Sequence, residues 1–183
     1  MHQHLYLQSA AVTVSLVGAV ADARTGRIPN ALTLPALVGG LLLNAAFHGT
    51  YGLVAGIAGV VLAGGVPALL HRITRGAAIG GGDVKLFAAL GALLGPSVGL
   101  QLELLSFGLL TVFALVRLAF LGRLFSVLLN VLRLVASPVL PQSWRTPIAQ
   151  EALTEMRLGP AIAAATLTVA LSTFVTGLVP WLG

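Results

Sequence analysis

The sequence has no cysteine and very little charge. Of its 183 residues, 57% are apolar and only 8% are charged. A soluble domain usually carries about 25% charged residues, so this chain has too little polar surface to cover a water-soluble globule. The absence of cysteine excludes a disulfide framework, a thiol nucleophile and a zinc site built from cysteine. The composition therefore predicts an integral membrane protein, with the lipid bilayer as its first partner.

Sequence patterns typical of several hydrolase classes are also absent. The chain contains no H-E-x-x-H zinc-protease motif and no G-x-S-x-G nucleophile motif. Its net charge of +5 does not indicate nucleic-acid binding, because the basic residues lie between apolar runs rather than in a folded basic domain. We therefore expect no metal, no cofactor and no nucleic-acid partner.

Six apolar segments are candidate membrane-spanning helices, which need about 20 residues, although the fourth of them is short. The first ends in Ala21-Asp22-Ala23, which looks like a signal-peptide cleavage site. No basic residue precedes it, so we expect an uncleaved spanning helix. The pattern predicts an all-α, polytopic membrane protein that forms a single domain over residues 1–183. The six segments are Leu5–Ala21, Ala31–Phe47, Gly52–Leu70, Val84–Leu94, Val98–Val116 and Ala161–Val179.

The basic residues are distributed very unevenly between the two sides of this topology. All 10 Lys and Arg lie in residues 22–30, 71–85 and 117–157, which face one side. The positive-inside rule makes that side cytoplasmic and puts both termini on the other side. Polar residues fall on one helical face of 118–137, which favours a cytoplasmic-side amphipathic helix over a seventh span.

The only two aspartates of the chain lie at this cytoplasmic boundary. Asp22 ends the first apolar segment, and Asp83 follows Gly80-Gly81-Gly82 at the start of the fourth. A carboxylate at the edge of the hydrocarbon is costly, so it is a functional candidate by default. Two carboxylates at one depth can perform acid–base hydrolysis as a pair. The alternative for Asp83 is a simple helix N-cap.

The three glycines before Asp83 predict a special loop. Glycine permits backbone conformations that are closed to other residues and lets a substrate backbone come close. Lys85 is near the same site because it follows Asp83 by two residues. We interpret Gly80, Gly81, Gly82 and Lys85 as residues that support the aspartates.

Together, the blocks from Asp22 to Asn30 and from Gly80 to Leu86 resemble those of the prepilin peptidases of type IV pili and related secretion systems. Those proteins are polytopic aspartic proteases of the GxGD type. The block Met156–Ala161 resembles a third family block, with Arg157-Leu158 in place of a Pro-Phe pair. The resemblance implies that Asp22 and Asp83 are catalytic. The candidate substrate-binding residues are Arg24, Arg27, Asn30, Gly159 and Pro160.

The resemblance also implies an activity and a location. The expected reaction is cleavage of the leader peptide of prepilin-like or pseudopilin-like substrates at the bacterial inner membrane. Larger family members carry a cysteine-rich insertion and an N-methyltransferase activity. This chain has no cysteine and resembles the compact tight-adherence (Flp pilus) members, so methylation is unsupported. A proton-coupled transporter or channel and a non-catalytic pilus-assembly scaffold are the alternatives. The oligomeric state and the role of Glu103 stay open.

Overall fold

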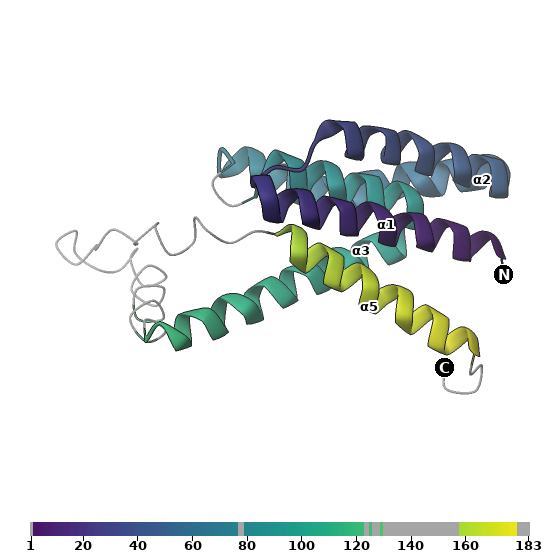
Figure 1. The fold of residues 1–183 in the computed structure, drawn as a ribbon. Coiled ribbons are helices and arrows are strands. Elements are labelled where there is room, and N and C mark those ends of the chain that lie inside the picture. Colours follow the sequence, from purple (N-terminus) through teal and green to yellow (C-terminus); the bar gives the residue numbers. More distant parts are fainter. Residues whose placement is uncertain (1, 77–78, 123–124, 126–128, 130–157, 179–183) are drawn as a thin grey trace. The chain divides into compact units, whose positions relative to one another are not determined.

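The computed structural model describes residues 2–76, 79–122, 125, 129 and 158–178 (Figure 1). These form the helices α1 (His2–Thr25), α2 (Asn30–Ile73), α3 (Gly81–Phe120) and α5 (Gly159–Leu178). The described part of the chain is all-helical, as predicted. Three helices, α1, α2 and α3, are long and apolar enough to cross a membrane, and α5 contains a shorter apolar stretch. The chain therefore has the helices of a membrane protein.

Two sequence predictions fall partly or wholly beyond this description. Most of the amphipathic helix expected at 118–137 lies outside the described residues, and residues 118–120 belong to α3. Residue contacts divide the chain into one unit of residues 1–108 and 157–183 and a second unit of residues 109–156. The single domain over 1–183 stays a prediction. The candidate site lies in the first unit.

The two longest helices, α2 and α3, each reverse direction at a glycine. Gly49 has φ 63° and ψ −145°, and Gly95 has φ 78° and ψ −179°, a backbone region that favours glycine. Phe87 and Phe107 lie on opposite sides of Gly95, yet their ring centroids are only 5.8 Å apart. In a continuous helix they would be separated by about 30 Å. Helix α3 is therefore a hairpin with arms 81–94 and 96–120.

Helix α2 is a second hairpin, with arms 30–48 and 50–73. Gly52 lies directly against the backbone carbonyl of Asn44, which a continuous helix would place about 12 Å away. A single 44-residue helix would be about 66 Å long, twice the thickness of the hydrocarbon core. Each arm alone has a length suited to the bilayer. The sequence breaks expected near residues 48–51 and 95–96 thus correspond to these reversals.

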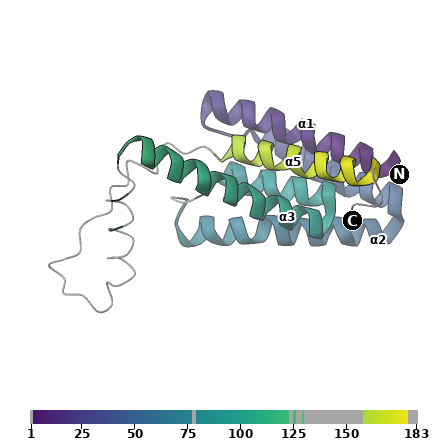
Figure 2. The same ribbon diagram turned by 90° about the horizontal axis from the view of Figure 1, so that it is seen from below.

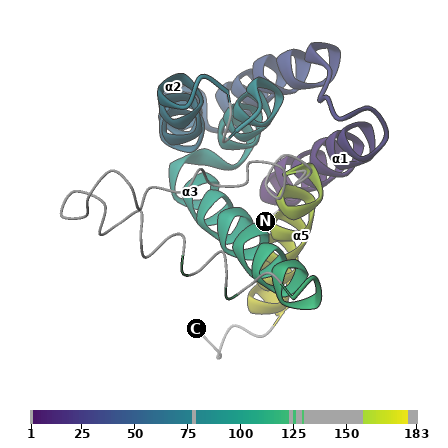
Figure 3. The ribbon, with the colours of Figure 1, turned by 90° about the vertical axis from the view of Figure 1, so that its left-hand side faces the viewer.

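Small residues allow the first arm of α3 to pack closely against both arms of α2. A Cβ added at Gly59 would collide with the backbone oxygen of Gly91, and one at Gly40 would lie 3.0 Å from the backbone of Ala92. Such contacts bring helix backbones together in membrane proteins. Figure 3, which views these helices nearly end-on, shows this arm of α3 beside the arms of α2.

A buried amide joins the two hairpins near their turns. Asn44 Nδ2 donates hydrogen bonds to the carbonyl oxygens of Ala92 at 2.8 Å and Leu93 at 3.0 Å. Both carbonyls belong to the last turn before Gly95, where a helix leaves its carbonyls without intrahelical partners. Asn44 therefore caps the first arm of α3 from the side of α2.

Helices α1 and α5 pack side by side, as Figures 1 and 2 both show. Leu7, Ala11 and Ser15 lie on the buried face of α1, spaced four residues apart as helical periodicity requires. Helix α5 buries Ile162 and Thr166 in the same way. This pairing is what brings the start of α5 to the end of α1.

Candidate active site

Asp22 lies in the last turns of α1, and its carboxylate is held by the first residue of α5. Only 7% of Asp22 is exposed. The backbone N–H of Gly159 donates a hydrogen bond to Asp22 Oδ2 at 3.1 Å. A Cβ added at Gly159 would lie 2.8 Å from both Cβ and Oδ2 of Asp22, too close for any side chain. Glycine at position 159 is therefore needed for this contact.

Asp83 is the third residue of α3, and one of its oxygens caps the start of that helix. The backbone N–H of Gly80, the residue before the helix, hydrogen-bonds to the Asp83 carboxylate. A carboxylate at the third helical position commonly reaches back in this way. The other oxygen, Oδ1, is buried and has no hydrogen-bond partner within the described part of the chain. One oxygen of Asp83 therefore caps the helix, and the other has no hydrogen-bond partner among the described residues.

The structure brings the two aspartates together. The carboxyl groups of Asp22 and Asp83 lie close enough to interact electrostatically. Helix α1 supplies one carboxylate at its C-terminal end, and α3 supplies the other at its N-terminal end. Two carboxylates placed in this way can bind and activate one water molecule.

The glycine run before Asp83 is used for close packing. None of Gly80, Gly81 and Gly82 has a positive φ, so the expected unusual backbone conformation is not of that kind. A Cβ added at Gly82 would instead lie 3.1 Å from Ile28 Cβ and 3.2 Å from Ile28 N. The turn before α3 thus packs against the loop that follows α1. That loop and Asp22 belong to the same sequence block.

Lys85 and Asn30 form a second link between these blocks. Lys85 Nζ donates a hydrogen bond to Asn30 Oδ1 at 2.8 Å, and both residues are exposed. The bond joins the first residue of α2 to the first turns of α3. Asn30, expected to contact substrate, thus has a partner within the protein, as Gly159 has in Asp22.

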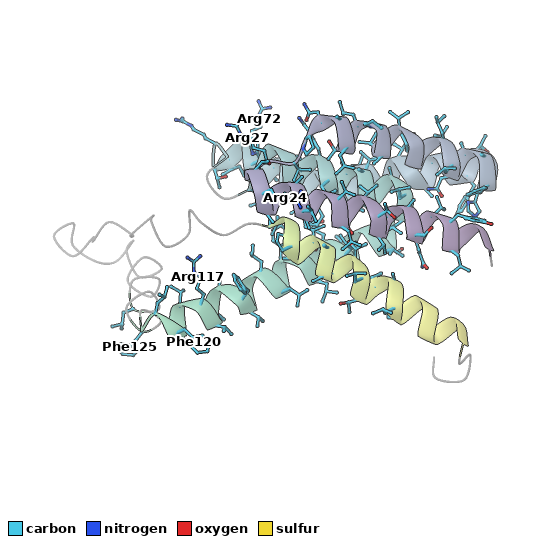
Figure 4. The ribbon with its side chains drawn as sticks, viewed as in Figure 1. Arg24, Arg27, Arg72, Arg117, Phe120 and Phe125 are labelled. Atoms are coloured by element: carbon cyan, nitrogen blue, oxygen red, sulfur yellow. The ribbon has the colours of Figure 1, made fainter. Side chains whose placement is uncertain are left out.

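The remaining predicted site residues are exposed near the aspartates. Arg24 lies in the last turn of α1 and Arg27 lies in the following loop, and both are solvent-accessible. Pro160, the second residue of α5, is also exposed. Figure 4 shows Arg24, Arg27 and Arg72 toward the same end of the helices. This end of the first unit therefore carries three exposed basic side chains.

Residues 9–136 match the type IV leader peptidase family. The chain belongs to this family. The matched range contains both aspartates, the glycine run and Lys85, whereas Gly159 and α5 lie beyond it. No curated protein and no solved structure matches the chain. Family membership identifies a protease of the leader-peptidase type.

The sequence of this leader-peptidase family member did not indicate that one histidine would lie near the candidate site. His71, near the end of α2, has its Nδ1 atom 2.7 Å from the carbonyl oxygen of Ile79, and its ring lies beside Gly81. A lone histidine at the end of an apolar segment has no distinctive pattern. The only available signal was its position before a loop that leads to Asp83.

Two further observations concern the other titratable side chains of the described residues. They contain no group of three or more His, Asp or Glu side chains that could hold a metal ion. Glu103, in the second arm of α3, is only 2% exposed, and its Oε2 atom has no hydrogen-bond partner in the described ranges. It is a buried carboxylate outside the Asp22–Asp83 pair.

Proposed function

We propose that this protein is an aspartic endopeptidase that removes the leader peptide of prepilin-like substrates at the cytoplasmic membrane boundary. The observation that carries the proposal is the convergence of Asp22 and Asp83 at one end of the helices, with Asp83 Oδ1 buried and uncommitted. Family membership supports leader cleavage in general. The paired carboxylates support the aspartic mechanism.

The reaction needs one water molecule and no covalent intermediate. One ionised carboxylate takes a proton from the water, and the water oxygen bonds to the scissile carbonyl carbon. The other carboxyl group donates its proton to the carbonyl oxygen, which gives a tetrahedral diol. When the C–N bond breaks, the first carboxyl returns its proton to the leaving amine, and a diol hydroxyl reprotonates the second. Like charges at close range favour one shared proton, as this cycle requires.

The hairpins support a topology of six crossings. Helices α1 and α5 would each cross once, and the two arms of α2 and of α3 would add four crossings. The basic residues at the aspartate end make that end cytoplasmic and both termini non-cytoplasmic. The protein would then be a compact, tight-adherence-type member in the bacterial inner membrane. Without the cysteine-rich insertion, methylation has no support.

The site suits a substrate with a short cytoplasmic leader followed by an apolar helix. The apolar helix would lie against the lipid-facing helices, and the leader would reach the aspartates from the cytoplasm. Arg24, Arg27 and Pro160 are exposed beside the pair and are the candidate substrate contacts.

The test is cleavage of a prepilin that is co-expressed with the wild type or with Asp22→Asn or Asp83→Asn. Both variants keep the size of the side chain but remove an ionisable carboxyl. We expect each to lower the cleavage rate by about 10³-fold or more, because each removes half of the acid–base pair. Glu103→Gln makes the same chemical change at the buried carboxylate outside the pair and serves as the control. Normal cleavage by both aspartate variants would contradict the proposal.

Glu103 is the observation that favours the alternative of a proton-coupled transporter or channel. A buried carboxylate within an apolar helix is a common element of proton pathways. That alternative predicts that proton flux into vesicles depends on the carboxylates while no prepilin is cut. A pilus-assembly scaffold instead predicts that pili assemble normally with both aspartate variants.

A further inference from the structure

The turn between α2 and α3 must place Asp83, and its geometry depends on the end of α2. Thr74 N–H donates to the carbonyl of Leu70 at 2.9 Å, and Gly76 N–H donates to the carbonyl of His71 at 2.8 Å. Arg75 and Gly76 both have positive φ, at 52° and 82°. Two successive residues in this region turn the chain sharply away from the helix. The chain then returns to begin α3 at Gly81.

His71 joins the two sides of this turn. Its Nδ1 atom lies 2.7 Å from the carbonyl oxygen of Ile79. A carbonyl oxygen only accepts hydrogen bonds, so Nδ1 must carry the proton and donate it. Ile79 is buried, so its carbonyl group would be costly to leave without a partner. The bond therefore fixes the backbone two residues before α3 begins.

The imidazole ring also fills the space inside the turn. A Cβ added at Gly76 would lie 3.2 Å from His71 Cε1, and one added at Gly81 would lie 3.6 Å from the same atom. The ring thus lies between the glycine that ends the α2 turn and the glycine that begins α3. No side chain is present at either position to take over this role.

The other side of the same helix start is held by the loop after α1. Ile28 packs against Gly82, and Asn30 accepts the hydrogen bond from Lys85. His71 and Ile28 therefore hold the first turn of α3 from two directions, and Asp83 lies in that turn. Loss of either contact would let the carboxylate move relative to Asp22.

We propose that His71 is a positioning residue, which sets the placement of Asp83 through its hydrogen bond to Ile79 and its contact with Gly81. The inference rests on the proposed function, since it assigns His71 a part in presenting a catalytic carboxylate. It does not make His71 a proton donor or acceptor in the reaction. Its effect should fall on kcat, because a displacement of about 1 Å in a reacting group can cost about 100-fold in rate.

The activity test compares three substitutions in the full-length protein in membranes. His71→Asn keeps an N–H donor near the position of Nδ1, whereas His71→Gln and His71→Leu do not. We expect kcat to fall about 10- to 100-fold in the Gln and Leu variants, with KM nearly unchanged, and to recover in the Asn variant. Ile73→Ala, at an exposed position on the same end of α2, is the matched control. Equal losses in all three His71 variants would overturn the role of the hydrogen bond.

A second readout does not depend on catalysis. The chain has no cysteine, so Asn30→Cys and Lys85→Cys together create a unique pair at two exposed positions. Bridging of this pair by short bifunctional thiol reagents reports where α3 begins relative to α2. We expect slower bridging in the His71→Leu background and restored bridging with His71→Asn. Unchanged bridging in His71→Leu would overturn the proposal even if no prepilin is cleaved, so its failure is distinct from failure of the proposed function.

Discussion

At the residue scale, the site depends on glycines as much as on aspartates. A Cβ at Gly159 would lie 2.8 Å from Asp22, too close to fit without a shift, and a Cβ at Gly82 would lie 3.1 Å from Ile28, a tight contact. In both cases the backbone of one sequence block meets a residue of another. In the proposed mechanism the carboxylates supply the chemistry, and the glycines allow the three blocks to meet around them.

The first prediction concerns Gly159→Ala. The added methyl group would lie 2.8 Å from Cβ and Oδ2 of Asp22, so Asp22 or the start of α5 must move. The variant should lose the hydrogen bond between Gly159 and Asp22 and cleave a prepilin about 100-fold more slowly. The rate of leader removal in membranes measures this. Gly108→Ala adds the same methyl group in open space and should cleave normally. Wild-type activity in Gly159→Ala would show that the contact is unimportant.

At the scale of the elements, the decisive feature is the reversal of α2 and α3 at Gly49 and Gly95. Each reversal turns one long apolar helix into two arms that fit a bilayer. The arms then pack through glycine contacts and through the amide of Asn44. These contacts place the start of α3, and therefore Asp83, at the end where α1 terminates.

The second prediction tests the contact between the hairpins. Gly59→Ala would drive a methyl group into the backbone oxygen of Gly91, whereas Gly65→Ala on the same arm meets open space. We expect Gly59→Ala to lower the free energy of unfolding by about 1–3 kcal/mol, as overpacking of a tight interface does. Thermal unfolding of the detergent-solubilised proteins should show a lower transition temperature only for Gly59→Ala. Equal transition temperatures for the two variants would mean that the hairpins do not pack as described.

The sequence predicted much of this arrangement, and the limits have physical causes. Apolar length and helix breakers located the helices and both reversals, because these depend on local composition and backbone freedom. The three glycines Gly80–Gly82 were expected to adopt a backbone conformation that is closed to other residues. None of them has a positive φ, so this expectation was wrong in that respect, because glycine serves close packing equally well. The contacts of Asn44, His71 and Gly159 link residues far apart in the sequence or follow no periodic pattern. Such contacts can be identified only from the three-dimensional packing of the helices.

At the scale of the whole molecule, Arg24, Arg27 and Arg72 lie toward one end of the described helices (Figure 4), the end at which α1 finishes after Asp22. The turns at Gly49 and Gly95 lie at the other end of the hairpins. From the positive-inside rule, we propose that this arrangement exposes the aspartates to the cytoplasm and the turns to the opposite side of the bilayer. The proposed membrane orientation rests on the hairpins and on the charge distribution.

The third prediction tests that orientation. Thr50→Cys is exposed beside the turn at Gly49, and Thr25→Cys is exposed at the aspartate end. A membrane-impermeant maleimide should label Thr50→Cys in spheroplasts with intact inner membranes and should label Thr25→Cys only after permeabilisation. Because the chain has no other cysteine, each signal comes from one site. The reverse pattern would put the aspartates outside the cytoplasm and contradict the proposed function.

The contact between Gly159 and Asp22 has a consequence for genetics. A screen for strains with impaired pilin processing should recover alanine and serine at position 159 in addition to asparagine at positions 22 and 83. Scoring schemes that rank glycine-to-alanine changes as conservative would dismiss such alleles as harmless. For this protein, we expect that a natural variant with every ionisable group intact can still be strongly impaired in leader removal.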